Sequence, residues 1–192
     1  TTGEGGMVTT SDERFYLKAL SIRQHGQREP GSNIHQVFGL NYRPSEIHAL
    51  LGLAMMAKSE WILAERRAAA KVYDELLASS PVKPVLAPEG HRPSYYKYMA
   101  LLPEGVDRLK VKTRLREEFG VALAGEVYAA PAHRQPLWES YSDRLAAPLE
   151  SLPNAEMVAR RQICLPIWPG LTRQDQNLVA ESLLSIIYDE SR

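Results

Sequence analysis

Two short segments of the chain gather side chains that could bind a phosphate or a sugar, and the first is Asn41-Tyr42-Arg43. Pro44 follows directly, and proline favours the first turn of a helix. Backbone amides at a helix start attract anions, and asparagine and arginine side chains add hydrogen-bond donors there. The segment is therefore a candidate anion site, although an ordinary helix cap beside a surface arginine has the same residues.

The second segment is the run Tyr-Ala-Ala-Pro-Ala-His-Arg-Gln-Pro at positions 128–136. Its prolines hold the backbone extended and keep it out of a central strand. A rigid loop that presents Tyr128, His133 and Gln135 suits a sugar or a phosphate. The alternative is a histidine in a surface loop with no ligand.

Other kinds of chemistry lack their signatures in this sequence. The glycine-rich segment 1–6 has neither the Gly-Lys-Ser/Thr ending of a Walker A loop nor the helix that follows a dinucleotide fingerprint. The remaining histidines lack metal-ligand spacing to Cys, Asp or Glu, and no Gly-x-Ser-x-Gly elbow of a serine hydrolase occurs. We therefore expect no metal site.

The composition is typical of a soluble globular protein, with 44% apolar and 24% charged residues among 192. Basic and acidic residues balance at 23 each, so no net field favours nucleic acid or an anionic membrane. The single cysteine, Cys164, lies in an apolar run, which indicates a buried thiol in a reducing compartment. Because no apolar stretch approaches the roughly 20 residues that span a bilayer, we expect a cytoplasmic protein without a membrane partner.

Helices with marked ends must position these segments. Asp12 is suited to cap a helix that ends near Gly26. The polar segment 27–40 lacks periodicity and is longer than most loops, which favours a functional loop. Pro44 opens the longest expected helix, whose apolar residues recur every three to four positions until Ser79-Ser80-Pro81. Such a length suggests a spine that joins two domains.

A smaller α+β unit is expected to follow from residue 81. Asp107 and Gly120 are suited to the two ends of a helix, and Thr172 with Asp175 has capping-box spacing before a final helix. The stretch 95–102 is rich in aromatic residues, which indicates a strand. The expected strands are 95–102, 122–127 and 163–168, with a strand-like stretch at 7–10.

Four runs, taken in order, carry a resemblance to a known family. They are Thr-Thr-Gly-Glu-Gly-Gly at 1–6 with a helix ending Arg23-Gln-His25-Gly26, Gly39-Leu-Asn41-Tyr42-Arg43-Pro-Ser-Glu46, the run at 128–136, and Cys164-Leu165-Pro166-Ile167-x-Pro169 with Leu171-Thr172. Together they resemble the DegT/DnrJ/EryC1/StrS family of PLP-dependent sugar aminotransferases over essentially the whole chain.

The resemblance implies an α/β, fold type I architecture: a large domain that holds pyridoxal 5'-phosphate (PLP) and a small C-terminal α+β domain, in a homodimer with shared active sites. Residues 1–80 would be the end of the large domain with the cofactor loop and linking helix, and residues 81–192 the small domain. By similarity, Asn41 would reach the cofactor phosphate of the neighbouring subunit, and Arg43 would help to bind that phosphate or the substrate. Tyr128 and His133 would lie near the nucleotide-sugar.

The cofactor lysine of the family lies just before the glycine-rich segment, so here it would precede Thr1, and no lysine in the chain occupies that motif position. We expect the C-terminal portion of a larger enzyme, inactive by itself. The leading hypothesis is transfer of an amino group from glutamate or glutamine to a keto-sugar, nucleotide-linked, in deoxysugar, antibiotic or polysaccharide biosynthesis. The alternatives are a PLP-dependent deoxysugar 3-dehydratase, in which histidine replaces the lysine, and a non-catalytic module that dimerises or binds a sugar nucleotide.

Overall fold

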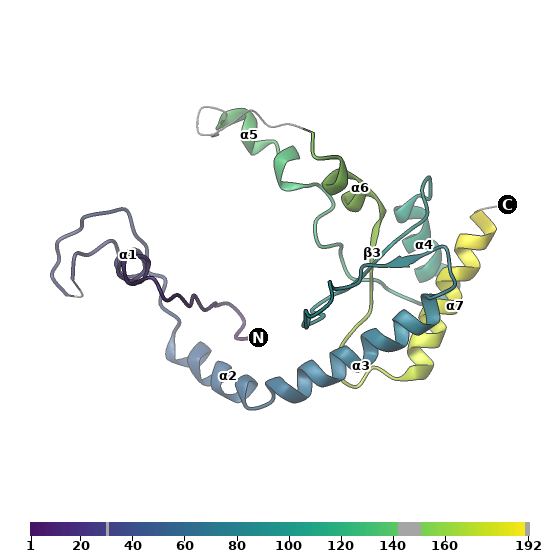
Figure 1. Ribbon diagram of the computed structural model, residues 1–192, viewed down its shortest axis with the longest axis horizontal. Coiled ribbons are helices and arrows are strands. Elements are labelled where there is room, and N and C mark those ends of the chain that lie inside the picture. Colours follow the sequence, from purple (N-terminus) through teal and green to yellow (C-terminus); the bar gives the residue numbers. More distant parts are fainter. Residues whose placement is uncertain (30, 142–150, 191–192) are drawn as a thin grey trace. The chain divides into compact units, whose positions relative to one another are not determined.

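The computed structural model describes residues 1–29, 31–141 and 151–190 and combines helices with a small sheet (Figure 1). The chain divides into two compact units, Thr1–Glu60 and Trp61–Arg192. The division of a larger fold at residue 80 stays a prediction. In chain order the elements are α1 Glu13–Arg23, α2 Glu46–Met56, α3 Ser59–Leu77, β1 Lys83–Pro84, β2 Tyr98–Leu101, α4 Arg108–Phe119, the 3-10 turn η1 Ala132–Arg134, α5 Leu137–Ser140, α6 Pro153–Arg161, β3 Gln162–Leu165 and α7 Arg173–Glu190.

The helix caps predicted at Asp12, Asp107, Gly120 and Thr172 are confirmed, whereas Pro44 lies just outside α2, which Ser45 caps. Asp12 accepts hydrogen bonds from the first backbone amides of α1, and Asp107 does the same at the start of α4. Gly120 ends α4 in the left-handed conformation, with φ of 68°. At α7, the amide of Asp175 donates to the Thr172 hydroxyl (3.1 Å), which donates in turn to the Asp175 carboxylate (2.6 Å). These local signals work because each cap satisfies amides or carbonyls that the helix itself leaves free.

The polar segment 27–40 folds back on the end of α1 at a crossing of two glycines. The amide of Gly26 donates to the carbonyl of Ser21, and the amide of Leu40 donates to that of Ile22. A Cβ atom added to Gly39 would lie 2.2 Å from the Gly26 nitrogen, and one added to Gly26 would lie 1.7 Å from the Val37 oxygen. Only glycine fits at both positions, so this crossing fixes the path of the loop.

The expectation of one uninterrupted helix from Pro44 to residue 80 is wrong. The structure has two helices, because α2 ends at Met56 and α3 begins at Ser59. The Ser59 hydroxyl donates to the Met56 carbonyl (2.8 Å). The Lys58 amide donates to the Met55 carbonyl, three residues earlier, as in a 3-10 turn rather than an α-helix. Side-chain hydroxyls compete with the helical ladder in this way. The interruption has no glycine or proline to mark it.

The second unit contains a three-stranded antiparallel sheet in the order β1-β2-β3. Tyr98 pairs with Leu165, and Leu101 pairs with Gln162. Both longer strands are shorter than predicted from the sequence: β3 ends before Pro166, which has no amide hydrogen for the ladder, and Tyr95 has a positive φ of 48° that a strand does not allow.

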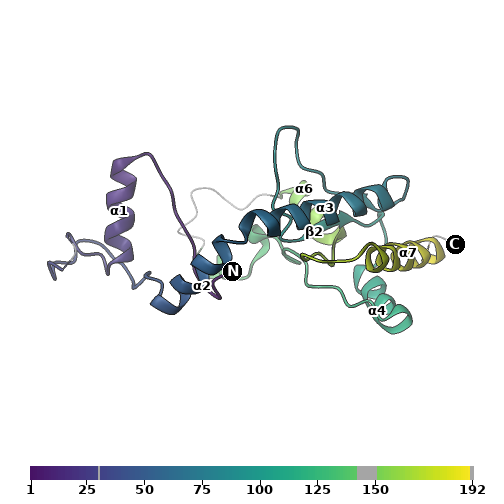
Figure 2. The same cartoon turned by 90° about the horizontal axis from the view of Figure 1, so that it is seen from below.

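Helices α3, α4 and α7 enclose the core of this unit with the sheet. Figures 1 and 2 both show α7 beside α4, and the side-chain amide of Gln176 on α7 donates to the Ala69 carbonyl on α3. The Tyr73 and Tyr98 rings pack 4.9 Å apart at the centre. The largest fully buried side chains are those of Tyr73, Tyr98, Leu77, Leu102, Leu115, Ile163, Leu183, Ile186 and Ile187.

Two other predicted strands do not form. Residues 7–10 are irregular and pair with no strand among the described residues. Residues 122–127 are also irregular, because side chains rather than a neighbouring strand hold this segment, as described below. Within the described ranges, no single helix is long and apolar enough to cross a membrane, and α2 and α3 meet that test only together, as a bent pair.

Candidate functional site

Asn41 and Arg43 form a joined group of hydrogen-bond donors in the first unit. The Arg43 Nε atom donates to the Asn41 Oδ1 atom at 2.7 Å. A β-bridge joins Asn41 to Gln24, and the Tyr42 amide donates to the Arg23 carbonyl, so the segment is fixed to the end of α1. The Asn41 amide group and the outer guanidinium nitrogens of Arg43 have no partner among the described residues.

Tyr128 is held through its backbone and presents its ring to solvent. Its side chain is 73% exposed, whereas Gln162 on β3 is only 3% exposed. The Gln162 side chain donates to the Tyr128 carbonyl (2.7 Å) and accepts from the Val127 amide (3.0 Å). One buried side-chain amide therefore replaces the ladder that a strand would have provided.

The segment before Tyr128 has a second set of anchors. Lys97 donates to the carbonyls of Gly125 and Glu126, and Lys112 donates to the Glu126 carboxylate at 2.8 Å. The pKa of Glu126 lies below its usual value: burial acts to raise it, but the Lys112 hydrogen bond and the Arg108 charge outweigh that effect. Glu126 therefore stays ionised and ties the segment to α4.

His133 and Arg134, on η1, share one carboxylate on α6. The Glu156 Oε1 atom lies 3.0 Å from His133 Nε2 and accepts from Arg134 Nε (3.0 Å) and Nη2 (2.8 Å). The hydrogen bonds from His133 and Arg134 lower the pKa of Glu156 to about 2. The His133 side chain is 9% exposed.

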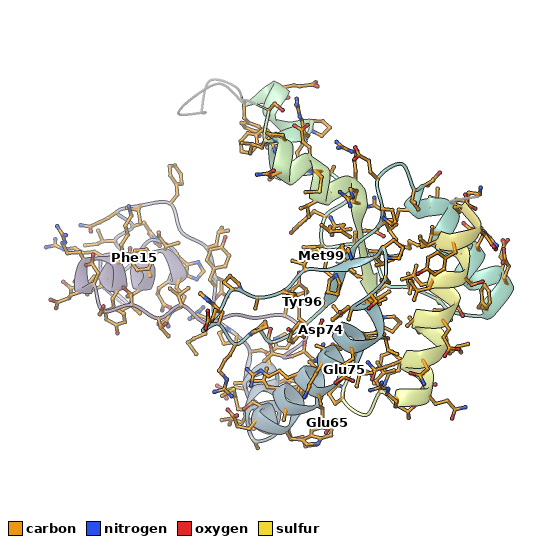
Figure 3. The ribbon with its side chains drawn as sticks, turned by 45° about the vertical axis from the view of Figure 1, so that its right-hand side comes forward. Phe15, Glu65, Asp74, Glu75, Tyr96 and Met99 are labelled. Carbon is orange, nitrogen blue, oxygen red and sulfur yellow. The ribbon has the colours of Figure 1, made fainter. Side chains whose placement is uncertain are left out.

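An open pocket of about 420 Å³ lies next to Tyr128. Its walls come from β2, the segment 127–132 and α6, and Figure 3 shows Met99 on β2 close to α6. Most of the lining is apolar, including Val158 and Ala155, while Asn154 adds an amide. Such a pocket suits the apolar part of a ligand whose polar part reaches the exposed segment.

Of the residues predicted for the site, the structure brings Asn41 and Arg43 into direct contact and places Tyr128 and His133 on one anchored segment. The first pair lies in one unit and the second pair in the other, and each is described by itself. The roles of all four in binding stay predictions. The described residues contain no group of three His, Cys, Asp or Glu side chains suited to a metal ion.

Sequence reasoning missed the two residues that hold the second segment. Glu156 lies on α6, which was not predicted, although Pro153 at its start and the spacing of Ala155, Val158 and Ala159 are helical signals. No local pattern marks Gln162, because its partners lie about 35 positions earlier in the chain.

Comparisons with known proteins agree on one family. The model of the DegT/DnrJ/EryC1/StrS aminotransferase family matches residues 1–184. GDP-perosamine synthase of Vibrio cholerae is 28% identical over 173 residues, which make up 89% of this chain and 45% of that protein. The chain spans about half the length of the curated relatives it matches.

Solved structures show the same fold. A DegT DnrJ EryC1 StrS aminotransferase from Brucella abortus has a TM-score of 0.76 and 24% identity, over 92% of this chain and 44% of that one. NtdA from Bacillus subtilis, solved with bound cofactor PMP, has a TM-score of 0.75 and 24% identity, over 93% and 41%. The architecture is that of fold type I PLP enzymes, as predicted. Because the family model covers residues 1–184 of 192, the chain belongs to the DegT/DnrJ/EryC1/StrS aminotransferase family.

Proposed function

We propose that the protein to which this chain belongs is a PLP-dependent aminotransferase that moves an amino group from glutamate or glutamine to a nucleotide-linked keto-sugar. The family match over residues 1–184 carries this proposal. GDP-perosamine synthases among the relatives support a sugar as the acceptor. Residues 1–80 would belong to the cofactor-binding domain and residues 81–192 to the small domain, in a cytoplasmic enzyme.

The donor group at Asn41 and Arg43 fits a phosphate such as that of PLP. Because Asn41 Oδ1 is occupied by Arg43 Nε, the asparagine turns its two N–H donors outward, and the guanidinium keeps four further N–H donors and its charge. The groups of this set that have no partner among the described residues are donors, which suits a dianion. PLP, when bound, supplies the carbonyl that takes up the amino group and the electron sink that the transfer needs.

On the substrate side, the proposal assigns the sugar nucleotide to the second segment. The exposed Tyr128 ring and the apolar pocket beside it offer a surface for a flat or apolar part of the ligand. His133 and the nearby Arg134 add polar groups. Binding energy from such remote parts of a substrate can position the reacting carbonyl.

Exposed apolar side chains of the first unit call for a covering surface, which the rest of the proposed cofactor-binding domain and the second subunit of the proposed homodimer with shared sites would provide. Neither α1 nor α2 contains a buried residue. Large apolar side chains that are mostly exposed are common in this unit, and apolar surface of this extent usually marks an interface. They include Phe15, Phe38, Leu40, Ile47, Leu50, Leu53 and Met56.

The first test asks which residue carries the cofactor. The natural full-length protein is incubated with PLP, reduced with borohydride and mapped by mass spectrometry. We expect a pyridoxyl group on a lysine immediately before Thr1. Bound PLP without a covalent label would favour the dehydratase, and absence of PLP binding would favour a non-catalytic module; either result would refute the aminotransferase.

The second test asks whether the donor group binds the phosphate. In the full-length protein, Arg43→Ala removes a charged donor worth about 1.5–3 kcal/mol, which is roughly a 10- to 150-fold weaker affinity for PLP. Asn41→Ala should also weaken PLP retention. Arg28→Ala is the matched control, because Arg28 is an exposed arginine of the same loop. Equal PLP affinity in the Arg43 and Arg28 variants would rule out the phosphate role.

A further inference from the structure

The carboxylate of Glu156 is placed where it determines the protonation pattern of the His133 ring. Four donors converge on its Oε1 atom: one from His133, two from Arg134, and the more distant Ser151 hydroxyl at 3.5 Å. An ionised carboxylate only accepts hydrogen bonds, so the ring nitrogen that faces it must carry a proton. At neutral pH this carboxylate is ionised, because the hydrogen bonds from His133 and Arg134 hold its pKa far below 7.

The opposite ring nitrogen is then defined as well. In a neutral imidazole one nitrogen donates and the other accepts, and which one does so is set by the partner of the first. With the proton on Nε2, the Nδ1 atom of His133 has a free lone pair. This atom has no hydrogen-bond partner in the part of the chain that the structure describes.

We propose that Glu156 is a positioning residue that fixes His133 as the Nε2–H tautomer, so that Nδ1 accepts a hydrogen bond from a hydroxyl group of the sugar substrate. This inference rests on the proposed function, because it takes a sugar nucleotide as the ligand of the segment. It adds a chemical requirement: the substrate must present a donor at this point. An analogue with hydrogen or a methoxy group in place of that hydroxyl leaves Nδ1 without a partner.

The competing explanation is that Glu156 only forms a structural ion pair between η1 and α6. Variants of Arg134 and Glu156 distinguish this explanation from the positioning of the His133 ring. Arg134 donates twice to the same carboxylate and, among the described residues, makes no hydrogen bond to the His133 ring. Arg134→Ala therefore weakens the link between the elements and leaves the Glu156–His133 hydrogen bond in place. Glu156→Ala removes both, whereas Glu156→Gln keeps an acceptor oxygen at the same position.

The deciding experiment is ¹⁵N NMR of the full-length protein labelled at histidine, above the pH at which the ring is charged, with His133→Gln to assign the signals. We expect His133 to carry its proton on Nε2 in the natural protein and in Arg134→Ala and Glu156→Gln. In Glu156→Ala we expect a mixture of the two tautomers. A proton on Nδ1 in the natural protein, or an unchanged tautomer in Glu156→Ala, would overturn the proposal.

A kinetic arm tests the link to the substrate. Loss of one neutral hydrogen bond predicts a roughly three- to tenfold higher KM for the sugar in Glu156→Ala, with the KM for the amino donor unchanged. Partial recovery is expected in Glu156→Gln. Equal rises in both KM values would refute substrate positioning. If the protein shows no transamination at all, the proposed function fails, while the NMR result still decides the tautomer.

Discussion

Replacement of Gln162 by leucine tests whether one buried amide positions the Tyr128 segment. Leucine is close to glutamine in size, so the change removes the two hydrogen bonds without leaving a large cavity. Each bond contributes about 1 kcal/mol net, so Gln162→Leu should lower the free energy of unfolding by about 2 kcal/mol. The loss would approach 4 kcal/mol if the Val127 amide stayed buried without a partner.

Gln176→Leu provides the matched control for this change. Gln176 is 2% exposed, close to the 3% of Gln162, but its side chain makes one hydrogen bond, to the Ala69 carbonyl. We expect about half the loss of stability, near 1 kcal/mol. Urea unfolding measures both losses, and hydrogen exchange reports on the Val127 amide, which should exchange faster only in Gln162→Leu.

Two outcomes would contradict the reasoning about Gln162. One is an unchanged exchange rate at Val127 in Gln162→Leu, which would show that the side-chain amide does not hold the segment. The other is an equal loss of stability in the two leucine variants, because the difference between them depends on the second hydrogen bond.

Two further predictions concern pH and the glycine crossing. The folded-state pKa of Glu156 is about 2, below its usual 4.5, so its ion pair stabilises the fold above pH 4.5 and this contribution is lost as pH falls towards 2. Urea unfolding of Glu156→Gln between these pH values should show a weaker pH dependence than the natural protein, whereas the exposed Glu89→Gln should not. Gly39→Ala should make the loop more sensitive to proteolysis, because the added Cβ atom would clash with backbone atoms of Gly26 and Ile22. Gly6→Ala is the control, because no atom lies within 4 Å of a Cβ added there. Equal cleavage of the two variants would refute the role of the glycine crossing.

The sequence predicts those features of the fold whose causes are local. Asp12, Asp107 and Thr172 each cap a helix within three residues, and such signals survive in any tertiary context. Local residues likewise predicted Asn41 between a loop and a helix start, and prolines predicted a loop around His133, where the structure forms the short 3-10 turn η1. Each of these predictions depends on a short window of residues.

Among the features that sequence reasoning missed, the path of residues 122–127 has distant causes. Residues 122–127 have only one β-branched residue, Val127, and no neighbouring ladder; Lys97 and Gln162 take their backbone groups instead. The break before Ser59 has a local cause, because the Ser59 hydroxyl donates to the Met56 carbonyl three residues earlier, but serine also occurs inside helices and does not mark the break by itself.

The two anchors of the candidate substrate segment belong to one continuous piece of structure. Helix α6 carries Glu156 and ends at Arg161, and β3 begins at the next residue with Gln162. The ladder to β2 fixes Gln162, and Arg108 donates to its carbonyl. Because Gln162 holds Tyr128 and Glu156 holds His133, the spacing between these two candidate site residues is set by the direct junction of α6 and β3. A ligand that contacts both therefore meets a preformed surface, and less of its binding energy is lost in ordering the segment.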